Sequence, residues 1–186
     1  MENKQQDEKK TVKFILLGDF QVGKTSISME YFNPKSSKNG NLTETHPTFE
    51  KNLQIKEKSI LLSIQDLNML DNDTYSNLEN LFQNVHFFIL CFSVNDSSSL
   101  EKLKKFYVPE IEKYSSNSYR ILVGTKSDSK NDKSISDKEV KVFSKESGCF
   151  EYIETSAHLR SNIDEIFEHC VGKLISKENK KDCILS

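Results

Sequence analysis

The chain has 186 residues, and its 26 lysines and arginines against 28 aspartates and glutamates leave a net charge of −2 at pH 7. This length suits one domain with a sizeable core. The near-neutral charge argues against general nucleic-acid binding, which favours a basic domain. Four cysteines show neither metal-ligand spacing nor the density of a disulfide framework, which indicates a reducing compartment.

Strand-like and helix-like patterns alternate along the chain. The run at residues 87–93 is continuous and apolar, which indicates a central strand but is too short to cross a bilayer. In chain order the patterns predict a strand at residues 12–17, a helix at 24–31, a loop at 33–47, strands at 53–56 and 59–65, a helix at 73–82, strands at 87–93 and 120–123, a helix at 136–146, a strand at 150–154 and a helix at 163–175.

Residues 97–114 repeat apolar side chains at helical spacing. We expect this helix to begin at a serine cap, with Glu101 in its first turn. Pro109 lies inside the pattern and should kink or divide the helix, because proline lacks a backbone N–H and clashes with the preceding turn.

The alternation of strands and helices predicts a single α/β domain, with a mostly parallel sheet and helices on both of its faces. We expect a disordered lead at residues 1–10, the folded domain at 11–176 and a basic tail at 177–186. The lead is charged and has no apolar core, so it does not resemble a signal peptide. In such sheets ligands bind at the carboxyl ends of the strands.

One segment lies at that position directly after the first predicted strand. Residues 18–25 read GDFQVGKT, which fits the phosphate-binding pattern G-x-x-x-x-G-K-[ST]. Between a strand and a helix, this loop surrounds a phosphate with backbone N–H groups and the positive end of a helix dipole. Lys24 would reach the β- and γ-phosphates, and the Thr25 hydroxyl would ligate Mg²⁺. The predicted phosphate-binding residues are Gly18, Phe20, Gln21, Val22, Gly23, Lys24, Thr25 and Ser26.

Two short motifs follow later strands: residues 124–128 read GTKSD, and residues 154–157 read ETSA. Together with the phosphate loop, in this order and spacing, they resemble small GTPases of the Ras superfamily. The resemblance implies a P-loop small G domain with a six-stranded sheet. Residues 88–94 and 109–111 look most like the Rho branch. The stretch at residues 128–156 is too short for the helical insert usual in Rho proteins, so we expect an atypical Rho-like protein.

The chemistry of the two later motifs points to guanine. The Asp128 carboxylate can accept two hydrogen bonds, from N1–H and the exocyclic amine of guanine, and adenine offers no such donor pair. Lys126 can lay its stem along the base, and Ser156 and Ala157 would offer backbone N–H groups to guanine O6. Thr125 resembles the family residue that ties this loop to the phosphate loop.

Departures from the family pattern bear on catalysis. Phe20 stands where Ras and Rho members usually have glycine, and its bulk should obstruct an arginine finger and the attacking water. The family motif D-T-A-G-Q appears as DLNML at residues 66–70. Met69 therefore replaces the glycine that senses the γ-phosphate, and Leu70 replaces the catalytic glutamine. Leucine cannot orient water, so we expect slow hydrolysis, unless a neighbour such as Asp71 takes over this role.

The resemblance also implies a magnesium site. Asp66 is retained and would hold Mg²⁺ through water, beside Thr25. The family's first-switch threonine follows proline, which selects Thr48, although Thr43 fits the spacing from the phosphate loop better. The aromatic residue that flanks the guanine is open: Phe32 is one candidate, and core packing is an equal alternative for it.

The sequence finishes in CILS at residues 183–186, a C-a-a-X box whose final serine favours farnesylation of Cys183. Basic residues upstream would add attraction to an anionic membrane surface; they are Lys173, Lys177, Lys180 and Lys181. We therefore expect a protein at the cytoplasmic face of a membrane, with a cytosolic pool.

The resemblance implies a Rho-like GTPase that binds GTP or GDP with Mg²⁺ and acts as a monomeric signalling switch. Effector proteins and exchange factors are its expected partners, and nucleic acid is not. Two alternatives stay open. One is a binding module that is constitutively loaded with GTP, and the other is a pseudo-GTPase whose second switch ignores the nucleotide.

Overall fold

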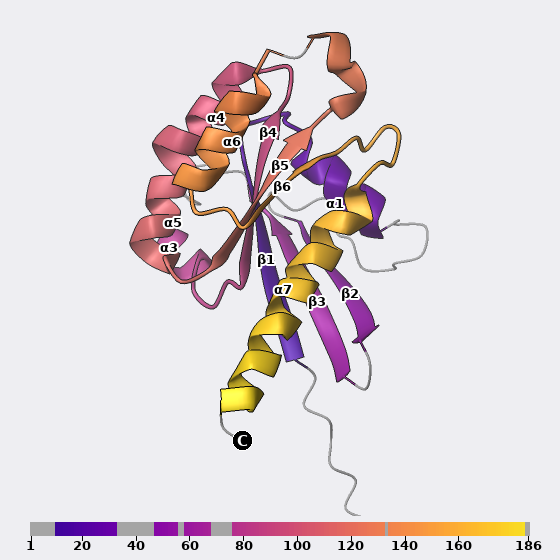
Figure 1. Ribbon diagram of the computed structural model, residues 1–186, viewed down its shortest axis with the longest axis vertical. Coiled ribbons are helices and arrows are strands. Elements are labelled where there is room, and N and C mark those ends of the chain that lie inside the picture. The colour runs from indigo at the N-terminus through magenta and orange to yellow at the C-terminus, as the bar shows by residue number, and fades with distance from the viewer. Residues whose placement is uncertain (1–9, 33–46, 56–57, 68–75, 133, 185–186) are drawn as a thin grey trace, which may run out of the picture.

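The computed structural model describes residues 10–32, 47–55, 58–67, 76–132 and 134–184. These residues form a six-stranded sheet in the order β2-β3-β1-β4-β5-β6 (Figure 1). Strand β2 runs antiparallel to β3, and the other neighbours are parallel. The strands are β1 (Lys10–Leu17), β2 (Thr48–Ile55), β3 (Lys58–Asp66), β4 (Phe87–Ser93), β5 (Tyr119–Thr125) and β6 (Glu151–Glu154). The predicted fold class, a mostly parallel α/β sheet, is confirmed.

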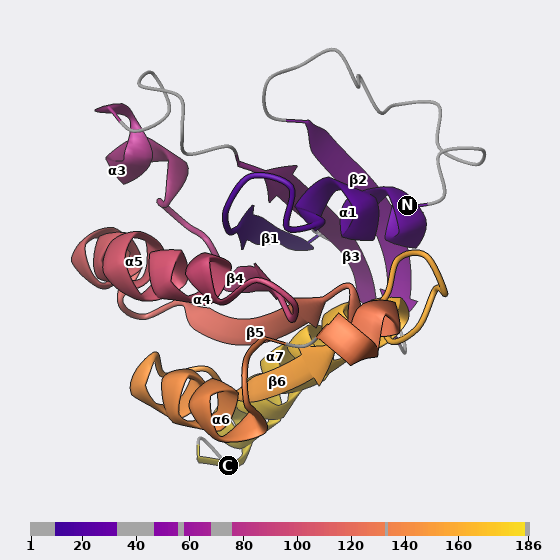
Figure 2. The same ribbon diagram turned by 90° about the horizontal axis from the view of Figure 1, so that it is seen from above.

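Helices cover both faces of the sheet (Figure 2). Helices α1 (Lys24–Phe32) and α7 (Ile163–Ile184) pack on one face, where Phe167 lies between Phe14 of β1 and Tyr31 of α1. The other face is covered by α3 (Leu78–Leu81), α4 (Ser97–Lys102), η1 (Leu103–Tyr107), α5 (Val108–Ser115) and α6 (Asp137–Glu146).

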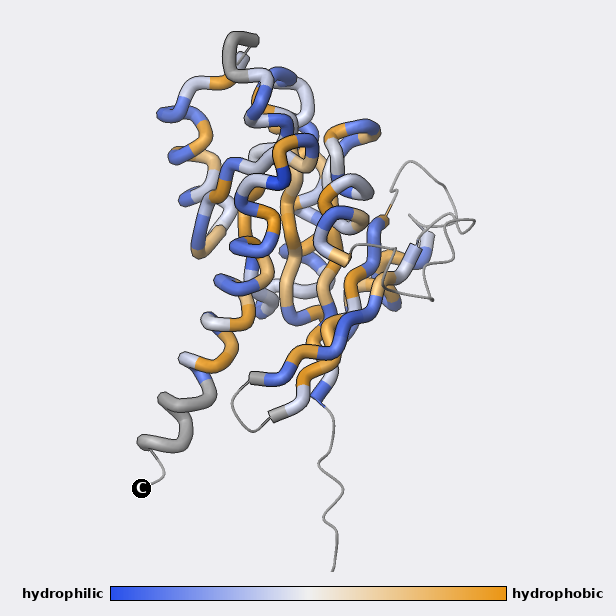
Figure 3. Tube along the Cα trace, turned by 90° about the vertical axis from the view of Figure 1, so that its right-hand side faces the viewer, coloured by the Kyte–Doolittle hydropathy of each residue, from blue (hydrophilic) through white to orange (hydrophobic). Residues whose placement is uncertain are grey.

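Strand β4 lies between β1 and β5, and every one of its residues is buried. Its side chains alternate between the two cores, Phe87 and Ile89 on the α1/α7 side and Phe88 and Leu90 on the other. This is why its sequence is continuously apolar rather than alternating. Figure 3 shows this apolar centre under helices of mixed hydropathy. Within the described residues, no helix is long and apolar enough to cross a membrane.

The helix predicted at residues 97–114 is divided, as Pro109 suggested. A π-helical turn, η1, joins α4 to α5 just before Pro109, which has no N–H to donate to the preceding turn. The predicted serine cap is wrong. Asp96 caps α4 instead, and its carboxylate accepts a hydrogen bond from the Ser98 N–H at 3.0 Å.

The bounds of β2 and α7 also differ from the predicted ones. Strand β2 begins at Thr48, five residues before the predicted strand, because polar residues suit this exposed edge strand and hid it from an apolar pattern. Helix α7 continues to Ile184 rather than ending at residue 175. Helix α6 begins with a capping box between Ser136 and Glu139, in agreement with the predicted bounds. A further 3₁₀ segment, η2, covers Ser127–Asp132.

Candidate functional site

The loop between β1 and α1 is built on close backbone packing. Gly18 has φ +155°, and a Cβ atom placed on it would lie 2.2 Å from the Cys91 carbonyl oxygen of β4. Gly23 has φ +104°, also in the region that favours glycine. The two glycines of the motif are therefore required by the fold itself. Beneath the loop, burial raises the pKa of the Cys91 thiol to about 12.

Lys24 crosses this loop from the first turn of α1. Its buried Nζ donates to the carbonyl oxygens of Gly18 and Asp19, both at 2.8 Å. Burial lowers the pKa of Lys24, and the nearby Asp66 carboxylate partly opposes that shift. The ammonium group is thus held at the mouth of a loop that would face a phosphate.

The remaining residues of the predicted phosphate site surround Lys24 in different environments. Val22 is buried, whereas Gln21 and Ser26 are exposed. Phe20 projects outward with 62% of its surface exposed, although apolar side chains of this size are usually covered. This places an aromatic ring on the solvent side of the loop.

Thr25 and Asp66 meet at the carboxyl end of β3. The parallel register pairs Asp66 with Leu16 of β1, which brings the carboxylate beside the phosphate loop. The Thr25 hydroxyl donates a hydrogen bond to Asp66 Oδ2. A hydroxyl and a carboxylate oxygen are ligands that suit Mg²⁺, so these two residues fit the predicted metal site.

The first-switch candidates are less fully described. Thr48 begins β2 opposite Gln65, and its side chain is exposed. The Pro47 carbonyl accepts the Asp66 N–H at 3.1 Å, so this segment borders the Thr25–Asp66 pair. Thr43 lies outside the described residues.

The catalytic substitutions of the second switch, Met69 and Leu70, and the neighbouring Asp71 are also outside the described residues. Phe32 is buried, stacks on Phe49 with ring centroids 5.4 Å apart, and contacts the edge of Tyr31. Core packing is therefore the role that the structure gives Phe32.

Thr125 joins the phosphate loop to the second predicted motif. It lies at the end of β5 with 3% of its surface exposed, and its hydroxyl donates to the Val22 carbonyl and, at 3.0 Å, to the Phe92 carbonyl. The predicted link between the two loops is thus present as a buried hydrogen bond.

The loops after β5 and β6 hold Asp128 in place. The Ser156 hydroxyl donates to Asp128 Oδ1 at 2.6 Å, and this bond lowers the pKa of Asp128. The Ser127 N–H donates to the Thr155 carbonyl at 3.0 Å. Lys126 is exposed and has φ +60°. In sequence it lies between Thr125, which contacts the phosphate loop, and Ser127, which contacts the loop after β6.

A pocket of about 210 Å³ lies against these loops. Its walls include Gly23 of the phosphate loop, and Lys126, Asp128 and Ala157 of the two later motifs. His158, which belongs to none of the predicted motifs, also lines the pocket. The phosphate loop and the predicted base-binding residues therefore share one cavity.

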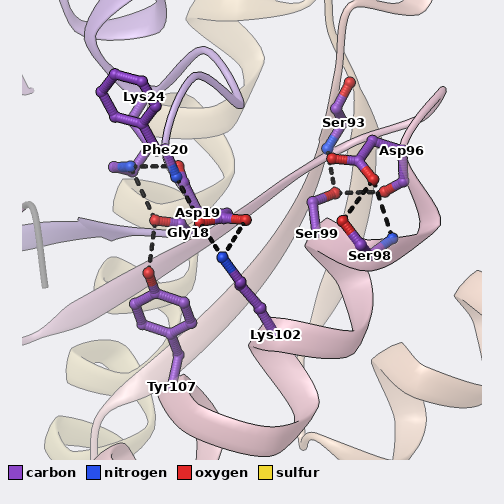
Figure 4. A network of polar contacts seen from close by, with 10 residues as sticks. All are labelled: Gly18, Asp19, Phe20, Lys24, Ser93, Asp96, Ser98, Ser99, Lys102 and Tyr107. Atoms are coloured by element: carbon purple, nitrogen blue, oxygen red, sulfur yellow. Dashed lines mark hydrogen bonds and ion pairs between the residues drawn. The ribbon is translucent and has the colours of Figure 1, made fainter. Parts of the chain in front are cut away.

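Sequence reasoning also missed a polar network behind the phosphate loop (Figure 4). The Tyr107 hydroxyl donates to the Gly18 carbonyl at 2.8 Å, and Lys102 forms an ion pair with Asp19 at 2.7 Å. These contacts cross more than 80 residues of sequence, so no local pattern could have revealed them.

The sheet order, the glycine-dependent loop after β1 and the pocket beside it define a P-loop α/β domain of the nucleotide-binding class. Residues 13–176 match the Ras family model, and the chain belongs to this family. As a Ras family member it is classed among the small GTPases.

Its curated relatives carry Rho-type names. The chain is 29% identical to the GTP-binding protein RHO4 of Saccharomyces cerevisiae over 89% of its own length, and it spans 58% of that protein. It is also 29% identical to the Ras-like GTP-binding protein RhoL of Drosophila melanogaster, covering 92% of this chain and 93% of RhoL. Human Rho-related GTP-binding protein RhoD is likewise 29% identical, with 92% and 86% covered. The predicted resemblance to the Rho branch is confirmed.

Proposed function

We propose that this protein binds GTP and GDP with Mg²⁺ and serves as a Rho-like signalling switch with weak GTPase activity. The observation that carries the proposal is the buried Thr125 hydroxyl, which fixes the phosphate loop against the loop that bears Asp128. A single ligand with a phosphate chain at one end and a base at the other suits the pocket that results.

At the phosphate end, Lys24 supplies positive charge to the β- and γ-phosphates, and the backbone N–H groups of the loop supply hydrogen bonds. Thr25, Asp66 through water, and Thr48 would hold Mg²⁺, which supplies charge neutralisation across the phosphates when bound. The proposed phosphate-binding set remains Gly18, Phe20, Gln21, Val22, Gly23, Lys24, Thr25 and Ser26.

At the base end, Asp128 accepts hydrogen bonds from guanine N1–H and the exocyclic amine. The Ser156 hydroxyl holds this carboxylate in position at 2.6 Å. The Ser156 N–H itself donates to the Ser161 carbonyl at 3.2 Å, so we assign the donor to guanine O6 to the Ala157 N–H. Lys126 covers one face of the base.

Hydrolysis should be slow because the chain lacks the usual means of positioning water. Leu70 replaces the glutamine that orients the attacking water, and the exposed ring of Phe20 hinders the approach of a stimulating arginine. An arginine finger and water positioning together contribute about 10⁵-fold in well-studied members. We expect Leu70→Gln to raise the single-turnover rate of GTP hydrolysis at least about tenfold, because glutamine restores a side chain that can orient the attacking water.

The exposed Phe20 also favours a second candidate function, a module that holds GTP almost constantly and presents one effector surface. Met69, in place of the sensing glycine, favours a related pseudo-GTPase. Comparing partner binding in the GDP-loaded and GTP-analogue-loaded states separates a switch, which discriminates, from a pseudo-GTPase, which does not.

The test of the proposed function is the nucleotide content of freshly purified protein, followed over hours in Mg²⁺. Bound GTP that converts to GDP slowly supports the weak GTPase, and GTP that persists supports the constitutively loaded module. Protein that contains no guanine nucleotide and binds none on titration would exclude both, and Asp128→Ala is the matched loss-of-binding control.

We also propose that the protein acts at the cytoplasmic face of a membrane, through a farnesyl group on Cys183 and nearby basic residues. Lys173 lies over the aromatic ring of Phe150 and Lys177 over that of Tyr119, and both lysines are exposed on α7. Equal membrane partitioning of Cys183→Ser and the parent protein would rule out lipidation as the anchor.

A further inference from the structure

We propose that Tyr107 and Lys102 are positioning residues that hold the phosphate loop in its binding conformation and so slow the release of bound nucleotide. The inference rests on the proposed nucleotide binding and adds to it a second support for the loop, supplied by the α4–η1 segment. Neither residue lines the pocket. Both contact the phosphate loop instead, Tyr107 at the Gly18 carbonyl and Lys102 at the Asp19 carboxylate (Figure 4).

Tyr107 fixes the first peptide of the loop. Its hydroxyl donates to the Gly18 carbonyl at 2.8 Å, and the same oxygen accepts Lys24 Nζ at 2.8 Å. A carbonyl oxygen has two lone pairs, so these donors satisfy it completely. The tyrosine is 4% exposed, and burial together with Asp19 raises its pKa to about 12, which keeps the hydroxyl protonated as a donor.

Lys102 fixes the second residue of the loop. Its Nζ lies 2.7 Å from Asp19 Oδ2 and 2.8 Å from Oδ1. The same Oδ1 accepts the Phe20 N–H at 2.7 Å, so the ion pair orients the backbone as well as the side chain. Asp19 is 13% exposed against 44% for Lys102, which makes this pair less screened than a surface salt bridge.

The π-turn explains how both residues reach the loop. Lys102 and Tyr107 are five positions apart, and in a regular α-helix such residues point about 140° away from one another. The wider η1 turn, with a hydrogen bond from the Val108 N–H to the Leu103 carbonyl, brings the two closer to one face. π-Turns of this kind are frequent at functional sites, and here the turn aligns two donors with consecutive loop residues.

A loop held in this way offers its N–H groups to phosphate without first having to become ordered. Release of a nucleotide requires the loop to loosen, so a lost anchor should act on the dissociation rate more than on the association rate. Lys24 is bound to the carbonyl that Tyr107 also holds, so the tyrosine additionally supports the position of the ammonium group.

The experiment measures dissociation of a fluorescent GDP analogue, chased with unlabelled GDP, from the full chain with Mg²⁺. Tyr107→Phe removes one hydrogen bond and should raise the dissociation rate about two- to tenfold. Lys102→Met should raise it about two- to fivefold, and Lys102→Arg should restore it. Tyr114→Phe, on the same helical segment but away from the loop, is the matched control and should leave the rate unchanged.

A second readout separates positioning from general destabilisation. GMP lacks the β-phosphate, so the ratio of GDP affinity to GMP affinity should fall in Tyr107→Phe and Lys102→Met and stay constant in the control. Unchanged dissociation rates, or an unchanged affinity ratio with a lowered melting temperature, would overturn the inference while leaving the proposed function intact. Failure of the parent protein to bind GDP would refute the proposed function, and with it this inference. If Tyr107→Phe does not fold, Lys102→Met still tests the inference, because the half-exposed Lys102 side chain can be replaced without disturbing the core.

Discussion

Removing the hydroxyl of Thr125 tests the proposed site directly, because this buried group connects the phosphate loop to the loop that bears Asp128. Thr125→Val keeps the shape of the side chain and removes that hydroxyl. The carbonyls of Val22 and Phe92 then lose a donor in an environment where Thr125 is 3% exposed. A buried polar group left without its partner costs about 1–3 kcal/mol.

For a domain of this length, each kcal/mol shifts the melting temperature by about 2–4 °C, so we expect a decrease of about 2–12 °C. We also expect GDP to dissociate more than about twofold faster, because the phosphate loop and the Asp128 loop lose their direct link. Differential scanning calorimetry and a stopped-flow chase measure the two quantities. Thr11→Val, on an exposed position of β1, is the control. A melting temperature and a dissociation rate both equal to those of the control would refute this reasoning.

Two further predictions concern packing and pH. Gly18→Ala forces a Cβ atom to within 2.2 Å of the Cys91 carbonyl, so urea denaturation should show a loss of about 3 kcal/mol or more, and a loss below about 1 kcal/mol would contradict the packing argument. Half-buried His86 accepts the Lys13 N–H at 3.2 Å, and burial lowers the pKa of His86 below 6.5. As the pH falls, His86 is therefore protonated more readily in the unfolded chain than in the folded chain. The free energy of unfolding should therefore decrease as the pH falls from 7.5 to 5.5, by less in His86→Gln; an equal decrease in both proteins would exclude His86 as the cause.

Much of the fold could be predicted because its signals are local. The buried strand β4 is apolar at almost every position, and α6 combines helical spacing with its Ser136–Glu139 cap. The phosphate loop was recognisable because backbone geometry demands glycine at fixed positions, as the Gly18 contact with β4 illustrates. Each of these features depends on a few residues that are close together in the sequence.

Some features escaped prediction because their partners are distant in sequence, and others because several neighbouring residues suit the same role. Nothing near Tyr107 announces a hydrogen bond to Gly18, and the π-turn that aligns it has no sequence rule comparable to a cap. Asp96 was passed over as the α4 cap because three serines follow it and suit the same role. The Ser156 N–H, a predicted donor to guanine O6, donates to the Ser161 carbonyl within its own loop, a contact that the motif alone does not indicate.

Cys91 lies directly beneath the phosphate loop, and its position has a practical consequence. Its thiol is fully buried and its pKa is raised, so the reactive thiolate hardly forms while β4 stays covered. A thiol-specific reagent can therefore modify it during transient opening of the structure. The rate at which Cys91 is labelled, measured on its own peptide, would report how often β4 becomes exposed beneath Gly18. Cys91 would thus serve as an internal probe of local unfolding under the proposed ligand-binding loop.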